Sequence, residues 1–307
     1  MMDNELLTSK ENKKTLISVL GWEDRFYKGI EYDFSTYNVD HLLLLVYQDY
    51  FNRDNFKLIM KSNLDKISEI CESSNITLKL INLNYSDEIE NYNKIGILKD
   101  EISYLNTKDI LIDITTIPRE VIWNILSFSL SMSTSVELIY HKPKDYDSWL
   151  CKNFEKPLLQ MGHSGISKFG IQTALIVITG FEAERTKQLI NHFEPDVVFL
   201  CVQTGQQFEN TKRNIESHKT FYTPNLIEFR EMDSYNIKLG AEILNNIVSK
   251  LDNYNIIIAS QGPKTSSVIA YNVFLNYSNI GLAYVPSKDI NINYSKGIDD
   301  NIKYKLK

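Results

Sequence analysis

The stretch TLISVL at positions 15–20, followed directly by Gly21-Trp22-Glu23-Asp24-Arg25, sets the plan of this chain. The same order returns far downstream, where ALIVIT at positions 174–179 is followed by Gly180-Phe181-Glu182-Ala183-Glu184-Arg185. Each copy is an apolar run of strand length, then a glycine, an aromatic residue, a glutamate and a nearby arginine. An apolar strand that ends in a glycine turn and leads into a helix is typical of a βαβ unit. The chain therefore starts the same unit twice.

Further features recur in both halves in the same order. They are a second apolar strand, a third one that ends in a proline followed by a basic residue, and a strand that ends in a tyrosine. The matching stretches are Val39–Tyr47 with Asp196–Val202, Asp109–Arg119 with Asn255–Lys264, and Leu138–Tyr140 with Leu282–Tyr284. Any two α/β domains share apolar strands, but the shared Gly-aromatic-Glu and Pro-basic patterns favour an internal duplication.

Helical patterns lie between these strands. Asp54–Glu72 places apolar residues at a period near 3.6, and Arg119–Ser133 is apolar on most sides, which is typical of a buried helix. Strands that are almost wholly apolar and alternate with helices predict an α/β fold with mainly parallel sheets flanked by helices. We therefore predict two tandem Rossmann-like repeats, residues 1–155 and residues 156–307. The tail after Asp289 alternates apolar and polar residues and predicts an added edge strand or a lid segment.

Composition narrows the function classes. The chain has 307 residues, of which 43% are apolar and 23% charged, so it can build two ordinary domains and is not a disordered protein. The net charge is −6, and we therefore expect no overall basic field for gripping nucleic acid, although a local basic patch stays open.

Cysteine and histidine spacing gives no support for a metal centre. The three cysteines, Cys71, Cys151 and Cys201, form no C-x-x-C pair, and the five histidines form no H-x-x-x-H pair. We expect no disulfide framework and no metal site. The polar start of the chain and the short length of its longest apolar run, Leu42–Tyr47, predict a cytoplasmic protein without a membrane span.

The repeated loops all follow strands, and ligands of open α/β sheets bind at the carboxyl ends of the strands. In the first pair of loops, Arg25 and Arg185 are candidates to hold an anion. Glu23, Asp24 and Glu182 are candidates to orient it, to accept sugar hydroxyls, or to act as catalytic acids or bases. The alternative is that these residues only cap helices and pair with each other, since a carboxylate at a helix N-terminus is stabilised by the helix dipole.

The second pair of loops has the composition of a phosphate cradle. Each loop joins hydroxyl groups, backbone amides, a proline at the helix start and a basic residue. Neither the G-x-G-x-x-G nor the G-x-x-x-x-G-K-[ST] spacing is present, so we expect neither an ordinary dinucleotide site nor a P-loop. Ordinary helix capping is the alternative here as well. The candidate ligand-binding residues of these loops are Thr115, Thr116, Arg119, Gln261, Gly262, Lys264, Thr265 and Ser266.

The duplicated plan, with Asp113-Ile114-Thr115-Thr116-Ile117-Pro118-Arg119 opening a helix after a strand, resembles the CARF superfamily. It is similar in particular to the SAVED arrangement, in which two CARF-like units are fused in one chain. The resemblance implies a Rossmann-like fold that binds cyclic oligonucleotides or related nucleotides in prokaryotic antiviral systems. It also implies ligand contacts from Thr115, Thr116, Arg119, Lys264 and Thr265.

Three function classes stay open from the sequence. The first is a sensor, or a component of an antiviral defence system, that binds a nucleotide or another phosphorylated small molecule. The second is an enzyme that hydrolyses nucleotides or transfers their glycosyl group, with Glu23, Asp24 or Glu182 as base or nucleophile. The third is a structural subunit that presents a surface to a protein partner. The sequence indicates no particular cofactor, and it leaves a homo-oligomer open.

Overall fold

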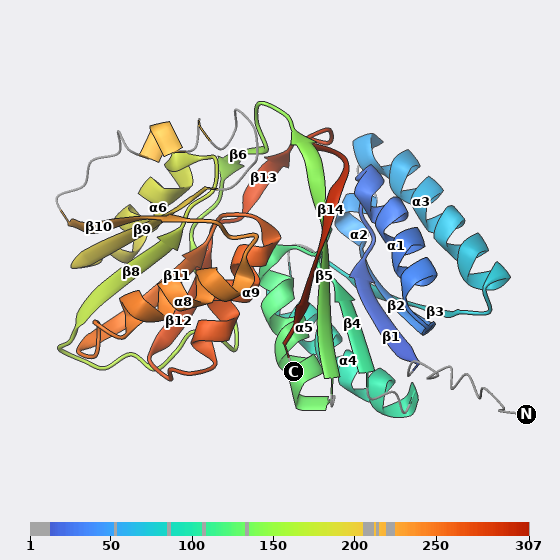
Figure 1. Cartoon of the computed structure of the whole chain (residues 1–307), viewed down its shortest axis with the longest axis horizontal. Coiled ribbons are helices and arrows are strands. Elements are labelled where there is room, and N and C mark those ends of the chain that lie inside the picture. The colour runs from blue at the N-terminus through green and yellow to red at the C-terminus, as the bar shows by residue number, and fades with distance from the viewer. Residues whose placement is uncertain are drawn as a thin grey trace, which may run out of the picture.

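The computed structural model describes residues 13–51, 54–84, 87–105, 109–132, 135–204, 212, 215–218 and 225–306. The chain forms two six-stranded sheets, each flanked by helices, which lie next to each other along the long axis of the molecule (Figure 1). A further two-stranded ribbon connects the halves at one side.

The first half alternates strands with helices up to its fifth strand. Its elements are β1 (Lys14–Val19), α1 (Asp24–Thr36), β2 (Val39–Tyr47), α2 (Gln48–Phe51), α3 (Asp54–Ser73), β3 (Thr77–Leu83), α4 (Glu88–Leu105), β4 (Asp109–Asp113), α5 (Arg119–Met132) and β5 (Ser135–Tyr146).

A connector with two short strands leads into the second half, which repeats the alternation and ends in two further strands. The elements are β6 (Cys151–Phe154), β7 (Leu158–Leu159), β8 (Gln172–Ile178), α6 (Ala183–Phe193), β9 (Val197–Gln203), β10 (Leu226–Met232), α8 (Ile237–Val248), β11 (Tyr254–Ser260), α9 (Lys264–Phe274), β12 (Ile280–Tyr284), β13 (Ser287–Ile290) and β14 (Ser295–Lys305).

The two sheets share one topology. The parallel strands run in the order β3-β2-β1-β4-β5 in the first sheet and β10-β9-β8-β11-β12 in the second. Each order places the first strand of the repeat at the centre, which is the arrangement of a Rossmann-like sheet. The prediction of two tandem Rossmann-like repeats with mainly parallel sheets is confirmed, and the equal strand order matches the repeated sequence features.

One antiparallel strand completes each sheet at the same edge. Strand β7 of the connector pairs with β12, and β14 of the C-terminal tail pairs with β5. The tail is thus an added edge strand, but it belongs to the sheet of the first repeat and not to residues 156–307 as expected. Alternation of apolar residues identifies a strand and cannot tell which of two sheets has the open edge, because both edges have the same strand order.

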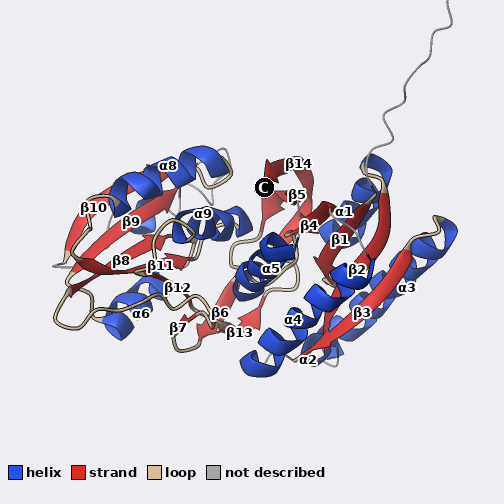
Figure 2. Cartoon of the chain, turned by 90° about the horizontal axis from the view of Figure 1, so that it is seen from below, coloured by secondary structure: helices blue, strands red, loops and turns tan. Residues whose placement is uncertain are grey.

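Helices cover both faces of each sheet. Helices α1 and α3 contact each other over one face of the first sheet, and α4 and α5 pack together on the other. Between the two sheets, α5 lies against α9, the equivalent helix of the second repeat (Figure 2). Trp123 of α5 is fully buried there and donates its indole N–H to the backbone oxygen of Ser267, 2.9 Å away. The two repeats therefore share an apolar core through equivalent helices.

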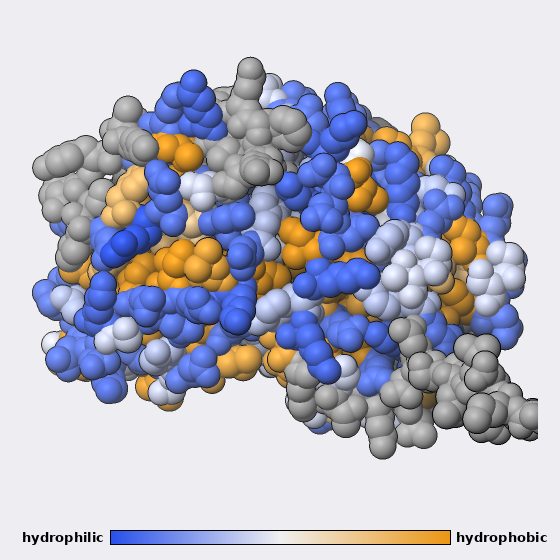
Figure 3. All heavy atoms as spheres, in the orientation of Figure 1, coloured by the Kyte–Doolittle hydropathy of each residue, from blue (hydrophilic) through white to orange (hydrophobic). Residues whose placement is uncertain are grey.

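Polar side chains predominate on the face of the molecule seen in Figure 3, with smaller apolar areas between them. Among the residues that the structure describes, no helix combines the length and the apolar character needed to cross a bilayer.

The repeated glycines after β1 and β8 allow a close approach of loops. A Cβ atom on Gly21 would come within 2.6 Å of Thr116 Cγ2, and one on Gly180 would overlap the backbone oxygen of Gln261. In each repeat the loop after the first strand thus lies directly against the loop after the fourth strand. The shared glycine has the same structural reason in both halves.

We expect Gly180→Ala to lower the free energy of unfolding by about 1–3 kcal/mol, because its Cβ meets a backbone atom that cannot move aside alone. Gly96→Ala in the interior of α4 is the control. There the new Cβ would lie 3.7 Å from Phe128, and alanine favours the helix by about 0.5–1 kcal/mol. Urea unfolding of both variants checks this, and equal effects would contradict the close-approach explanation.

Candidate ligand-binding site

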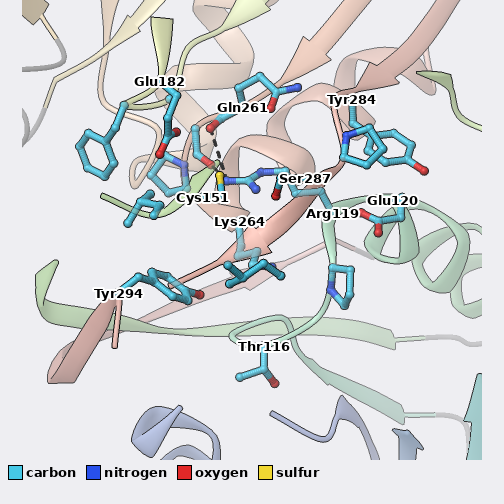
Figure 4. A pocket seen from close by; sticks show the side chains of 18 of the residues that line it. Thr116, Arg119, Glu120, Cys151, Glu182, Gln261, Lys264, Tyr284, Ser287 and Tyr294 are labelled. Carbon is cyan, nitrogen blue, oxygen red and sulfur yellow. Dashed lines mark hydrogen bonds between the residues drawn. The ribbon is translucent and has the colours of Figure 1, made fainter. Parts of the chain in front are cut away.

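The carboxyl ends of both sheets face one cavity, which encloses about 1390 Å³ of empty space, open solvent included. The loops after β1, β4 and β5 line it from the first repeat, and the loops after β8, β11 and β12 line it from the second. Figure 4 shows Glu182 and Gln261 on one side of the cavity and Thr116 on the opposite side, with Arg119, Cys151 and Lys264 between them. This is the place where the fold predicts a ligand.

Two basic residues join the repeats at this cavity. Arg119, the first residue of α5, donates a hydrogen bond to the backbone oxygen of Gly262 in the second repeat. Lys264, the first residue of α9, donates in return to the backbone oxygen of Ile117, 2.5 Å away. We call this pair of contacts the reciprocal clasp. It occupies Lys264 Nζ and one end of Arg119, whereas Arg119 Nε has no hydrogen-bond partner.

Arg25 is held by the protein itself. It is 1% exposed and pairs with Glu23, and it donates to Ser295 Oγ at 3.2 Å and to the backbone oxygen of His141 at 2.6 Å. Tyr294 donates to the other oxygen of Glu23 at 2.5 Å. Glu23 and Arg25 therefore anchor the C-terminal tail to the start of α1, and they line the cavity as an already paired group.

The equivalent Glu–Arg pair in the second repeat keeps atoms without hydrogen-bond partners. Arg185 is buried and lies over the ring of Phe154, with 5.1 Å between the guanidinium carbon and the ring centre. Neither Arg185 Nε nor Glu182 Oε1 has a hydrogen-bond partner, and both residues line the cavity. The second copy of the Glu–Arg pattern is thus available to a ligand, in contrast to the first.

Several of the predicted hydroxyl groups form hydrogen bonds within the protein. Thr116 donates to the backbone oxygen of Val19 at 2.6 Å, and Thr115 Oγ1 accepts the backbone N–H of His141. Ser266 Oγ contacts Ser260 Oγ at 2.7 Å. These contacts are the capping and loop-fixing roles that the sequence left open as the alternative.

The structure brings nine of the predicted residues to the cavity wall and leaves four away from it. Thr265 and Ser266 are buried because they turn toward the sheet in the first turn of α9, and Asp24 is exposed and pairs with Lys28. On the wall lie Glu23, Arg25, Thr116, Arg119, Glu182, Arg185, Gln261, Gly262 and Lys264, whereas Asp24, Thr115, Thr265 and Ser266 do not line it.

Tyr146, Phe181 and Tyr294 of the wall were not among the predicted site residues. Tyr146 and Tyr294 are stacked with 6.3 Å between ring centres, and the edge of Tyr146 meets Phe181 at 5.5 Å. Trp22 and Cys151 also line the cavity. The aromatic residue after each repeated glycine, Trp22 and Phe181, was the available signal. Tyr146 and Tyr294 come together only because β14 crosses back to the first repeat.

Buried polar atoms without partners gather at this cavity. Among the described residues, six such side-chain atoms belong to its wall: Trp22 Nε1, Arg119 Nε, Glu182 Oε1, Arg185 Nε and both polar atoms of the Gln261 amide. Leaving a buried polar group unpaired costs about 1–3 kcal/mol. The cavity therefore carries donors and acceptors that a polar ligand or water can satisfy.

Burial perturbs the charged groups between the repeats. Burial and the charge of Arg119 lower the pKa of Lys264 to about 7. Burial and the charge of Arg185 lower the pKa of Arg119 as well, and burial raises the pKa of the neighbouring Glu120. Cations crowded in this way favour a bound anion, because an anion offsets both the burial and their mutual repulsion.

Comparisons with known proteins add little. The chain matches no protein-family model and no curated protein. Among solved structures it is similar to the cytoplasmic domain of a prokaryotic cation chloride cotransporter, with a TM-score of 0.31 and 12% identity over 90% of this chain and 96% of that one. A likeness of this size carries no argument about function.

We expect the free energy of unfolding to rise as the pH increases from about 7 toward the ordinary pKa of lysine. In that range the unfolded chain keeps the Lys264 proton and the folded chain releases it, so higher pH favours the folded state. Lys264→Met removes this contribution. Urea unfolding of both proteins at a series of pH values measures it, and parallel profiles would contradict the lowered pKa.

Proposed function

We propose that this chain binds a nucleotide or another phosphorylated small molecule in the cavity between its repeats, as a sensor or as a component of a multi-protein defence system. The observation that carries the proposal is the set of unpartnered buried groups of Arg185, Gln261 and Glu182 on one wall. A subunit that only presents an outer surface to a partner has no need for such groups inside a cavity.

The chemistry of the wall suits each part of a nucleotide. Arg185 and Arg119 offer positive charge for a phosphate, with the Nε atom of each unpaired, and Lys264 adds charge in its protonated form. The carboxylate of Glu182 can accept hydroxyl groups of a sugar. The stacked rings of Tyr146 and Tyr294 offer an aromatic surface beside them for a base.

The resemblance to the CARF and SAVED domains agrees with this assignment in one respect. The loop that carries the resemblance ends in Arg119, which lies on the cavity wall, and the matching loop supplies Lys264. A role in antiviral defence rests on that resemblance alone, and it stays a prediction.

Arg185→Met tests the site with little change in packing, because methionine can keep the contact with Phe154. Isothermal titration with a panel of mononucleotides, cyclic dinucleotides and cyclic oligoadenylates should find a ligand of the wild-type chain. We expect the variant to bind that ligand at least about tenfold more weakly, since a charged hydrogen bond contributes about 1.4 kcal/mol or more.

Arg230→Met is the matched control, because Arg230 of β10 is half-exposed, pairs with Glu228 and does not line the cavity. The control should bind like the wild type. Nucleosides without phosphate should bind weakly or not at all. Failure of every phosphorylated compound to bind, or equal loss in both variants, would overturn the proposal.

An enzyme that acts on the bound nucleotide is the second candidate. Of the predicted acids, Asp24 is paired outside the cavity and Glu23 is bound to Arg25, so Glu182 is the one with an unpartnered oxygen inside. Glu182→Gln should then abolish turnover and leave binding within about threefold of the wild type. Chromatography of nucleotides after incubation measures turnover, and equal rates in both proteins would remove Glu182 from the mechanism.

A further inference from the structure

A buried cluster of three ionisable side chains lies beneath the cavity, within the first repeat. Asp33 of α1, Asp113 at the end of β4 and His141 of β5 are each 0% exposed. One oxygen of each aspartate and one ring nitrogen of His141 lie within 4.8 Å of one another. The cluster is separate from the cavity, since none of the three side chains lines its wall.

Asp33 and His141 face each other in the cluster without a well-formed hydrogen bond. Both carboxylate oxygens of Asp33 and Nε2 of His141 are buried without a hydrogen bond. His141 Nε2 lies 3.4 Å from Asp33 Oδ1. Zinc bonds to nitrogen and oxygen of about 2.0–2.2 Å in a tetrahedron separate neighbouring ligand atoms by about 3.3–3.6 Å. The two atoms are therefore spaced as two ligands of one small cation.

Groups around the cluster fix the ligand atoms. Asn301 of β14 places its amide oxygen 2.6 Å from His141 Nδ1, and because that oxygen can only accept, the ring proton sits on Nδ1. This leaves Nε2 directed at Asp33. Asp113 Oδ1 accepts the backbone N–H of Thr115 at 2.9 Å, which orients that carboxylate. Such outer contacts are typical of metal-binding histidines and carboxylates.

We propose that Asp33, Asp113 and His141 bind a divalent cation of the zinc type. Two carboxylates and a neutral imidazole balance a charge of +2. Without a cation, protons bound by the cluster would have to offset the charge of the two buried carboxylates. An imidazole together with carboxylates is a ligand set that suits Zn²⁺, whereas Ca²⁺ and Mg²⁺ favour sites made of oxygen ligands alone. The three side chains would fill three positions of a four-coordinate zinc ion, and a fourth donor such as water would complete the set.

The second repeat shows that the fold does not need this cluster. Aligning Tyr140 of β5 with Tyr284 at the end of β12 puts Val285 at the place of His141. Leu16 of β1 pairs with Leu111, and the equivalent Leu175 of β8 pairs with Ile257, which puts Ala259 at the place of Asp113. Both replacements are buried and apolar. The first repeat therefore keeps charged groups where an apolar core would serve the fold alone.

Without a cation, protons balance the charge of the cluster. Burial raises the pKa of Asp33 to about 7. Burial opposes the charged form of His141, but the contact with Asp33 and the charge of Asp113 raise its pKa to about 9. In the absence of a cation the cluster would take up protons in its place, and cation binding would release them.

The cation would tie α1, β4 and β5 together, and through Asn301 also β14 (Figure 1). The backbone oxygen of His141 accepts a hydrogen bond from Arg25, so the site also supports the wall of the cavity.

Metal analysis of the full chain tests the proposal. After removal of metal with a chelator, titration with Zn²⁺ should load about one ion per chain, and EDTA should then lower the melting temperature. Asp33→Asn and Asp113→Asn, which keep the shape of the side chains, should each weaken zinc binding by at least about tenfold. Asp24→Asn, an exposed position on the same helix, should bind like the wild type.

Spectroscopy on the wild type keeps the test independent of the variants. Co²⁺ in place of zinc should give the visible absorption of a four-coordinate site, and X-ray absorption of the zinc form should show nitrogen and oxygen ligands without sulfur. A folded wild-type chain that binds no zinc, sulfur ligation, or full zinc binding in both cluster variants would overturn the proposal. None of these readouts depends on a ligand in the cavity.

Discussion

The reciprocal clasp is the constraint on which the rest of the structure depends. Arg119 reaches the loop before α9, and Lys264 reaches the loop before α5, while the two helices pack against each other. Each contact comes from the first residue of the helix after the fourth strand of its repeat. The carboxyl ends of both sheets are thereby brought to one place, and the cavity is shared by the repeats.

The two repeats have the same fold, but their equivalent Glu–Arg pairs differ in their contacts at the cavity. In the first repeat the Glu–Arg pair is closed by Ser295 and Tyr294 of the tail, so it fastens the chain. In the second repeat the equivalent Arg185 and Glu182 keep unpaired atoms that face the cavity. The tail is the physical reason for the difference, because β14 extends the sheet of the first repeat only.

The two repeats also differ in the buried side chains that lie directly below the strand-end loops. Charged side chains occupy this layer in the first repeat, and apolar ones such as Ala259 and Val285 occupy it in the second. A buried ionic cluster contributes little to stability unless its charges are balanced, which is why the cation is proposed for the first repeat and not for the second.

The sequence by itself determined the α/β class, the two repeats and the loops at the strand ends, because apolar periodicity and glycine or proline turns are local signals. It also named nine residues of the cavity wall. Only the tertiary structure decided that Arg25 is paired within the protein while Arg185 keeps an unpaired nitrogen. The same holds for the contacts of Tyr146 with Tyr294 and of Asp33 with His141. These contacts join residues that are far apart in the chain. They depend on how distant elements pack, such as the path of β14 and the packing of α5 on α9, and no local sequence pattern encodes that packing.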